Sequence, residues 1–100
     1  MITEQGDVLK VPGLCSMPVV VVSKNLFNRG DSTMVCPVTD DCPDSFLHIE
    51  VKYNGTEGTV LCEQVRMIDL RKRGFTKIGR MQMPDLMNIT DAIQSIFDYI

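Results

Sequence analysis

Six basic residues crowd into one short stretch of the sequence. They are Arg66, Arg71, Lys72, Arg73, Lys77 and Arg80. A cluster of this kind is either a solvated turn or a patch that faces phosphate groups, which is chemistry that a nucleic-acid-binding protein needs. The net charge of the chain is −3, which argues against a protein that coats nucleic acid non-specifically. Any phosphate-binding surface is therefore expected to be local.

The cysteines and the single histidine lack the spacing of a metal site. Cys15, Cys36, Cys42 and Cys62 form no CxxC pair, and His48 is the only histidine. Zinc sites usually show such pairs, so we expect no metal. Cys36 and Cys62 lie in apolar strand patterns and are interpreted as small core residues that stay reduced.

The elements that position these side chains are strands first and a helix last. Four consecutive valines, Val19–Val22, predict a strand that is buried on both faces. Asn25–Asn28 is expected to form one helical turn. Alternation and turn residues predict strands at Gly6–Val11, Pro18–Ser23, Thr33–Val38, Phe46–Val51, Thr59–Cys62, Val65–Ile68 and Phe75–Met81.

Three details of the strands are also predicted. Asn54-Gly55 and Glu57-Gly58 are expected to be hairpin-type turns, and a kink is expected at Glu63-Gln64. Pro37 has no backbone N–H, so it should lie at an edge or at the end of a ladder. His48 is expected on the polar face of its strand.

The C-terminal segment changes period. Apolar residues recur at three- and four-residue spacing, which predicts an amphipathic helix from Pro84 to about Tyr99. The length of 100 residues predicts a single domain, 1–100, of mainly β structure with a C-terminal helix (α+β), arranged as a small barrel that the helix closes. No apolar run is long enough for a membrane span, and the polar N-terminus is not typical of a signal peptide, so we expect a cytoplasmic protein.

Several stretches carry a resemblance to a known family. The sequence reads GDV at 6–8, PVVVVS at 18–23, FN at 27–28, CPVT at 36–39 and GTVLCEQVRMIDLRKR at 58–73. Together with the terminal helix, their order and spacing resemble the MazF/PemK (Kid-like) family of type II toxin-antitoxin endoribonucleases. The resemblance covers nearly the whole chain.

The resemblance implies a fold and an activity. Members of that family have a small SH3-like barrel with a C-terminal helix, form homodimers, and inhibit growth by cutting single-stranded RNA without a metal or other cofactor. A cognate antitoxin silences them by threading along the dimer. The partners implied for this chain are therefore single-stranded RNA, an antitoxin protein and a second copy of itself, in the cytoplasm.

The resemblance also implies site residues. Thr39 matches a threonine of the family's site and Glu63 an acidic position, so both are predicted to be catalytic. The family has an arginine before the proline of the buried strand, where this sequence has Met17, and a second cationic position falls on Leu61. Losing a charge-stabilising contact of this kind typically costs about 10²–10³ in rate.

Four cations are predicted to bind RNA: Arg29, Arg66, Lys24 and Arg80. Arg29 follows the predicted helical turn and is the candidate to replace the arginine that Met17 lacks. We further expect Thr39, Glu63 and Arg66 to line one concave surface near the dimer seam.

Three functions are compatible with these residues. The first is an active, metal-independent endoribonuclease toxin with a rearranged site. The second is a non-catalytic homologue that binds RNA, an antitoxin or a related toxin. The third is a toxin that uses the same fold to poison DNA gyrase through its last residues, which often include a tryptophan; this chain has none.

Overall fold

The structure is a computed structural model that describes residues 3–14, 17–25, 27–30, 32–40 and 43–97. Within these residues seven strands, two 3-10 turns and two helices follow one another along the chain. Their bounds are β1 Asp7–Lys10, β2 Val19–Val21, η1 Phe27–Arg29, β3 Ser32–Thr39, β4 His48–Tyr53, β5 Thr56–Leu61, η2 Cys62–Gln64, β6 Arg66–Asp69, α1 Leu70–Arg73, β7 Thr76–Arg80 and α2 Met83–Ile96.

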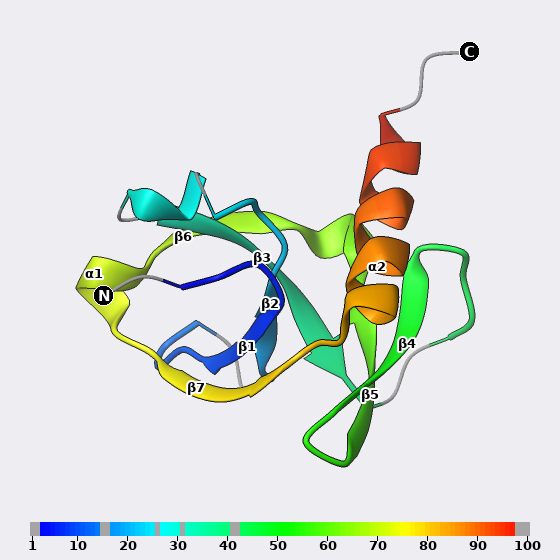
Figure 1. Cartoon of the computed structure of the whole chain (residues 1–100), viewed down its shortest axis with the longest axis horizontal. Coiled ribbons are helices and arrows are strands. Elements are labelled where there is room, and N and C mark those ends of the chain that lie inside the picture. The colour runs from blue at the N-terminus through cyan, green and yellow to red at the C-terminus, as the bar shows by residue number, and fades with distance from the viewer. Residues whose placement is uncertain (1–2, 15–16, 26, 31, 41–42, 98–100) are drawn as a thin grey trace.

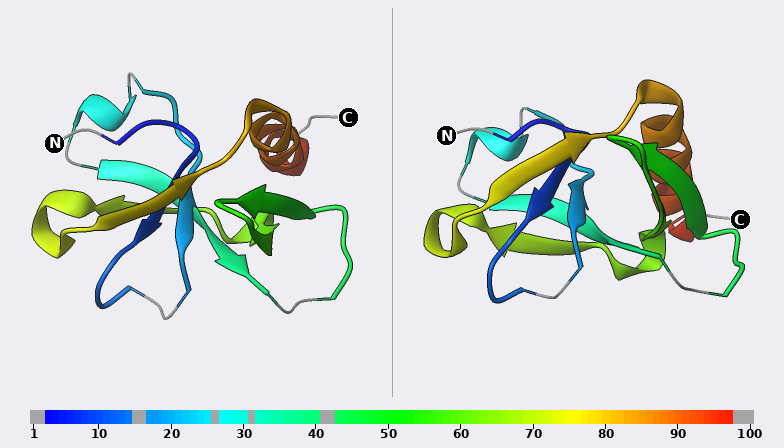
Figure 2. Two further views of the ribbon diagram at one scale, coloured as in Figure 1. Left: turned by 60° about the horizontal axis from the view of Figure 1, so that its bottom comes forward. Right: turned by 90° about the horizontal axis from the view of Figure 1, so that it is seen from below.

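The strands form one curved sheet in the order β4-β5-β3-β2-β1-β7, and β6 pairs with the first half of β3. Every pairing is antiparallel. The sheet curls into a half-barrel, and α2 lies against β4 and η2 at one end of it (Figures 1 and 2). This arrangement confirms the prediction of a mainly β fold with a C-terminal helix.

The core has two parts, one on each face of the central strands. Val19 and Val21 of β2 pack in one cluster, with Val35 of β3. Val20 of β2 packs in the other, with Cys36 of β3. The valine strand is therefore buried on both faces, as its sequence predicts.

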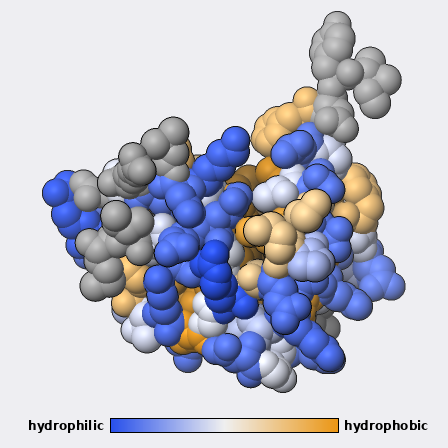
Figure 3. Space-filling model, viewed as in Figure 1, coloured by the Kyte–Doolittle hydropathy of each residue, from blue (hydrophilic) through white to orange (hydrophobic). Residues whose placement is uncertain are grey.

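The helix α2 is amphipathic. Its residues Leu86, Ile89 and Ala92 are buried. Met83, Met87, Ile96 and Phe97 stay exposed, and apolar surface is visible over α2 in Figure 3. One apolar face of the helix therefore packs against the barrel, and a second group of apolar side chains is exposed to solvent.

Pro37 lies inside β3, at the place where its neighbour changes. On one side of β3 the ladder with β6 ends at Val35 and the ladder with β5 begins at Val38. On the β2 side of β3, Val38 donates its backbone N–H to the carbonyl oxygen of Pro18. The backbone nitrogen of Pro37, one residue earlier, therefore faces the opposite side, in the gap between the ladder with β6 and the ladder with β5. The missing N–H of Pro37 thus falls at a ladder end, as predicted.

One predicted turn is wrong. Asn54 and Gly55 form the β4–β5 hairpin turn, with φ values of 49° and 75°, but Glu57 and Gly58 are inside β5. A Cβ atom at Gly58 would lie 2.8 Å from Cγ1 of Val38. The glycine therefore serves close packing between β5 and β3 and not a turn.

The helical turn α1 was not predicted from the sequence. It begins because Asp69 accepts hydrogen bonds from the backbone N–H groups of Arg71 and Lys72. It ends at Gly74, whose φ is 68°. Part of the basic cluster is therefore on a short exposed helical turn at one end of the barrel.

None of the helices in the described part of the chain is both long and apolar enough to cross a membrane. The longer of them, α2, has 14 residues.

Candidate functional site

Thr39 is the last residue of β3 and begins a row of polar side chains. It pairs with Thr59 of β5, which in turn pairs with Glu50 of β4. Directly paired residues of neighbouring strands point to the same face of a sheet. His48, two residues before Glu50, lies opposite Leu61 and extends this face. Three strands thus bring these side chains to one surface.

Met17 and Thr39 line the same pocket, which has a volume of about 240 Å³. Asp40 and Glu57 supply carboxylates to its wall. The remaining lining residues are Pro18, Val38, Tyr53, Thr56 and Gly58. Among the described residues, no lysine or arginine lines this pocket. The position where the family resemblance predicts an arginine therefore opens into a pocket with two acidic residues in its lining.

A second hollow adjoins this pocket and shares Asp40 and Glu57 with it. Glu50 and Asp85 add two more carboxylates to the wall of this hollow, and Lys52 adds a cation. The amine of Lys52 lies 3.4 Å from the carboxylate of Glu57. The potential around the pocket is thus acidic, which disfavours the approach of a phosphate.

Glu63 is on η2 and forms an ion pair with His48. Its Oε2 lies 2.8 Å from Nε2 of His48. The hydrogen bond with His48 lowers the pKa of Glu63, and the same contact raises the pKa of His48. Glu63 is therefore a carboxylate at neutral pH, held by a histidine that lies on the same face of the sheet as Thr39.

Arg66 is exposed on β6. It pairs with Val35, four positions before Thr39 on β3, which corresponds to about 13 Å along the strand. Arg66 is not among the residues that line the pocket of Thr39 and Met17. Glu63 is not among them either, so the three predicted residues share a side of the sheet without lining one pocket.

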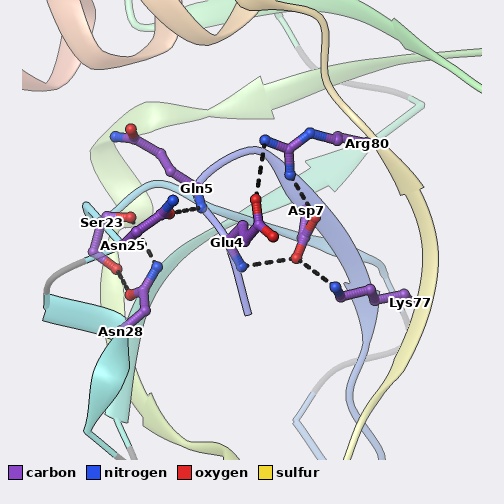
Figure 4. A network of polar contacts seen from close by, with 8 residues as sticks. All are labelled: Glu4, Gln5, Asp7, Ser23, Asn25, Asn28, Lys77 and Arg80. Carbon is purple, nitrogen blue, oxygen red and sulfur yellow. Dashed lines mark hydrogen bonds and ion pairs between the residues drawn. The ribbon is translucent and has the colours of Figure 1, made fainter. Parts of the chain in front are cut away.

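Arg80 on β7 takes part in an ion-pair network at another edge of the sheet (Figure 4). Its guanidinium lies 2.8 Å from Asp7 and 3.7 Å from Glu4. Lys77 contacts the other oxygen of Asp7 at 3.1 Å. The side chain of Asp7 is buried, so these cations neutralise a carboxylate of the barrel itself.

The other predicted RNA-binding cations lie near η1. Lys24 is exposed after β2. Arg29 is the last residue of η1, and its side chain lies outside the described part of the structure.

The sequence pattern did not predict the contacts of His48. Alternation correctly placed it on the polar face of β4. Its partners are in other segments, since Nδ1 lies 2.6 Å from the carbonyl oxygen of Pro43 and Nε2 contacts Glu63. The only signal in the sequence was that His48 is the sole histidine. The described residues contain no group of three or more histidines, cysteines or carboxylates that could hold a metal ion.

Comparison with known proteins identifies similar sequences and folds. A family model described as "PemK-like, MazF-like toxin of type II toxin-antitoxin system" matches residues 15–97. No curated protein sequence matches the chain.

Solved structures match over nearly the full length. A MazE-MazF crystal structure from Deinococcus radiodurans aligns with a TM-score of 0.86 and 19% identity, covering 97% of each chain. A mycobacterial endoribonuclease in complex with its cognate antitoxin gives 0.82 and 16%, covering 95% of this chain and 94% of that one. The Mycobacterium tuberculosis toxin MazF-mt6 gives 0.77 and 16%, covering 94% and 98%. At sequence identities of 16–19%, the structural similarity establishes the fold of this chain.

Proposed function

The chain belongs to the PemK-like, MazF-like toxin family of type II toxin-antitoxin systems, and from this we propose that it is the toxin component of such a system and an endoribonuclease that cleaves single-stranded RNA without a metal. The observation that carries the proposal is the family match over residues 15–97, on a fold that aligns end to end with solved MazF structures.

The geometry of the site supports a specific version of this activity. In cleavage by the 2′-hydroxyl, this oxygen loses its proton and bonds to phosphorus, the charge on the phosphate is stabilised, and the departing 5′-oxygen gains a proton as its bond to phosphorus breaks. Glu63 is an ionised carboxylate at the face where Thr39 supplies a hydroxyl. We assign proton acceptance to Glu63 and a hydrogen bond to the phosphate to Thr39.

One observation favours a second candidate function. The pocket of Met17 and Thr39 has Asp40 and Glu57 in its wall and no lysine or arginine among its described lining residues. RNA binding relies on cations that neutralise phosphates, and an acidic wall opposes it. The second candidate is therefore a non-catalytic member of the family that binds an antitoxin or a related toxin.

Partners and location follow from the same proposal. A mycobacterial endoribonuclease with a similar fold has been solved in complex with its cognate antitoxin, so we propose a cognate antitoxin for this chain. We also propose that the single domain 1–100 forms a homodimer in the cytoplasm. The exposed apolar side chains of α2, among them Met83 and Met87, support the presence of a protein partner.

A cleavage assay in EDTA separates the two candidates. Purified protein is incubated with a long single-stranded RNA, in parallel with Thr39→Ala and Glu63→Ala. Discrete fragments that disappear in both variants would support the endoribonuclease. If the RNA stays intact at all protein concentrations while Met17→Arg cleaves it, the native chain is the non-catalytic homologue.

A further inference from the structure

The two ring nitrogens of His48 both face hydrogen-bond acceptors. Nδ1 lies 2.6 Å from the carbonyl oxygen of Pro43, and Nε2 lies 2.8 Å from Oε2 of Glu63. A carbonyl oxygen and a carboxylate can only accept, so both ring nitrogens must donate. A neutral imidazole has a single N–H. Both hydrogen bonds can therefore form together, with Glu63 ionised, only while His48 is an imidazolium cation.

His48 joins two segments that no other side-chain hydrogen bond among the described residues connects. Pro43 belongs to the segment before β4, and Glu63 belongs to η2 after β5. The side chain of His48 is only 12% exposed, whereas that of Glu63 is 39% exposed. The imidazole is thus more covered than the carboxylate that it holds.

The same histidine lines a hollow beside the row of polar side chains. Ser45, Glu50 and Thr59 line this hollow with it. Thr59 is the cross-strand partner of Thr39. His48 therefore contacts the predicted proton acceptor, Glu63, and shares a hollow with Thr59, the cross-strand partner of the predicted phosphate contact, Thr39.

We propose that protonated His48 is the positioning residue of the RNA site: it holds the Glu63 carboxylate and the segment at Pro43 in place on the face of the sheet that carries Thr39, so that the site is assembled while the imidazole carries its charge. This inference rests on the proposed function. It makes activity dependent on pH.

The sign of the pH dependence follows from the groups around His48. The hydrogen bond with Glu63 and that with the Pro43 carbonyl raise the pKa of His48 above its ordinary value, against the opposing effect of desolvation. The charges of Glu63 and Asp44 act in the same direction. Glu50, on the same strand, is a further carboxylate at the hollow, and the facing strand β5 supplies uncharged Thr59 and Leu61. The site is therefore complete below the raised pKa and loses one hydrogen bond above it.

Proton NMR tests the inference directly, because the native chain has a single histidine. The imidazole C2–H resonance is titrated in the full chain, without an affinity tag, alone and with an uncleavable single-stranded oligonucleotide in which fluorine replaces each 2′-hydroxyl. We expect the pKa of His48 to fall toward the ordinary histidine value in Glu63→Gln and to change when the oligonucleotide binds. Asp91→Asn, an exposed carboxylate-to-amide change on α2, should leave this pKa at its wild-type value.

A rate measurement provides the second readout. The cleavage rate of the native protein should fall as pH rises through the pKa that NMR gives for His48. In His48→Gln, which keeps one donor and loses the charge, kcat should drop about 10²-fold with little change in KM, and the pH dependence should disappear. Thermal unfolding of each variant shows whether it remains folded at the assay temperature.

The outcomes separate this inference from the proposed function. An oligonucleotide that binds without changing the His48 titration, or one that does not bind, overturns the inference whether or not the protein cleaves RNA. Cleavage by a folded His48→Gln at the native rate and with the native pH profile also overturns it, but leaves the endoribonuclease proposal intact. If the native protein does not cleave RNA but the pKa of His48 changes when the oligonucleotide binds, the endoribonuclease proposal is wrong. The inference that His48 helps to assemble an RNA-binding site is then retained.

Discussion

Met17 and Thr39 meet in one pocket because β2 and β3 pair antiparallel. Met17 lies just before β2, and Thr39 ends β3, so the start of one strand adjoins the end of the other. The Met17 side of this pocket is where the family resemblance predicts an arginine. Position 17 is therefore a place where one substitution changes the charge next to Thr39.

Restoring that charge should increase activity. In Met17→Arg, a guanidinium would enter a pocket with Asp40 and Glu57 in its wall and could bind a phosphate at Thr39. We expect RNA cleavage to increase by about 10²-fold. Met17→Gln, which is polar and uncharged, should show less than a tenth of that gain. Equal rates in the two variants would mean that charge at position 17 does not limit the reaction.

The fold was largely predictable, since periodicity and turn residues report local environments. The four valines, the Asn54-Gly55 turn and the terminal helix each have a physical signature that depends on neighbouring residues alone. Gly58 was misread because its role comes from Val38 on another strand. The helical turn α1 was missed because its cap, Asp69, resembles any acidic residue before a basic run.

The site was less predictable than the fold. Family resemblance selected Thr39 and Glu63, and the register of three strands then placed His48 on the same face as Thr39, where it contacts Glu63. That register depends on long-range pairing, which no pattern within one segment encodes. The same reason applies to Arg80, whose partner Asp7 lies at the other end of the chain.

Gly58→Ala should destabilise the barrel. The added Cβ would lie 2.8 Å from Cγ1 of Val38, inside the packed contact of β5 with β3. We expect a loss of about 1–3 kcal/mol in the free energy of unfolding, measured by urea denaturation. Gly30→Ala is the matched control, because its Cβ would find its nearest neighbour at 3.9 Å. Similar losses in both variants would contradict the packing role of Gly58.

Asp7 should make the barrel sensitive to acid. Burial acts to raise the pKa of Asp7, but the backbone N–H of Glu4 and the cations Lys77 and Arg80 outweigh it, so this pKa lies below the ordinary value. A carboxylate with a depressed pKa stabilises the fold above its unfolded pKa, and this contribution is lost as pH falls through the folded pKa. Asp7→Asn should therefore lower the free energy of unfolding by about 1–3 kcal/mol at pH 7 and have a smaller effect at pH 3. Glu57→Gln, which removes an exposed ion pair, should change stability little at either pH.

Cys36 and Cys62 should be unreactive in the folded protein. Both are buried, and burial raises the pKa of Cys36 to about 12 and that of Cys62 to about 11. Because the thiolate is the reactive form, a thiol reagent at pH 8 should modify these two residues only after denaturation. Peptide mapping by mass spectrometry reports each residue separately. Rapid labelling of either one in the native state would show that the core cluster to which both belong opens readily.

Arg66 and Arg80 should respond differently to replacement. Arg66 is exposed on β6, so Arg66→Gln should weaken RNA binding and reduce the slope of log affinity against log salt by about 0.7. Arg80 lies against Asp7 and Glu4, so Arg80→Gln should instead lower the melting temperature and leave the salt slope unchanged. Lys24→Gln, at an exposed position after β2, tests whether the RNA path extends to η1. A reduced salt slope in Arg80→Gln at an unchanged melting temperature would mean that Arg80 leaves its ion pairs to contact RNA.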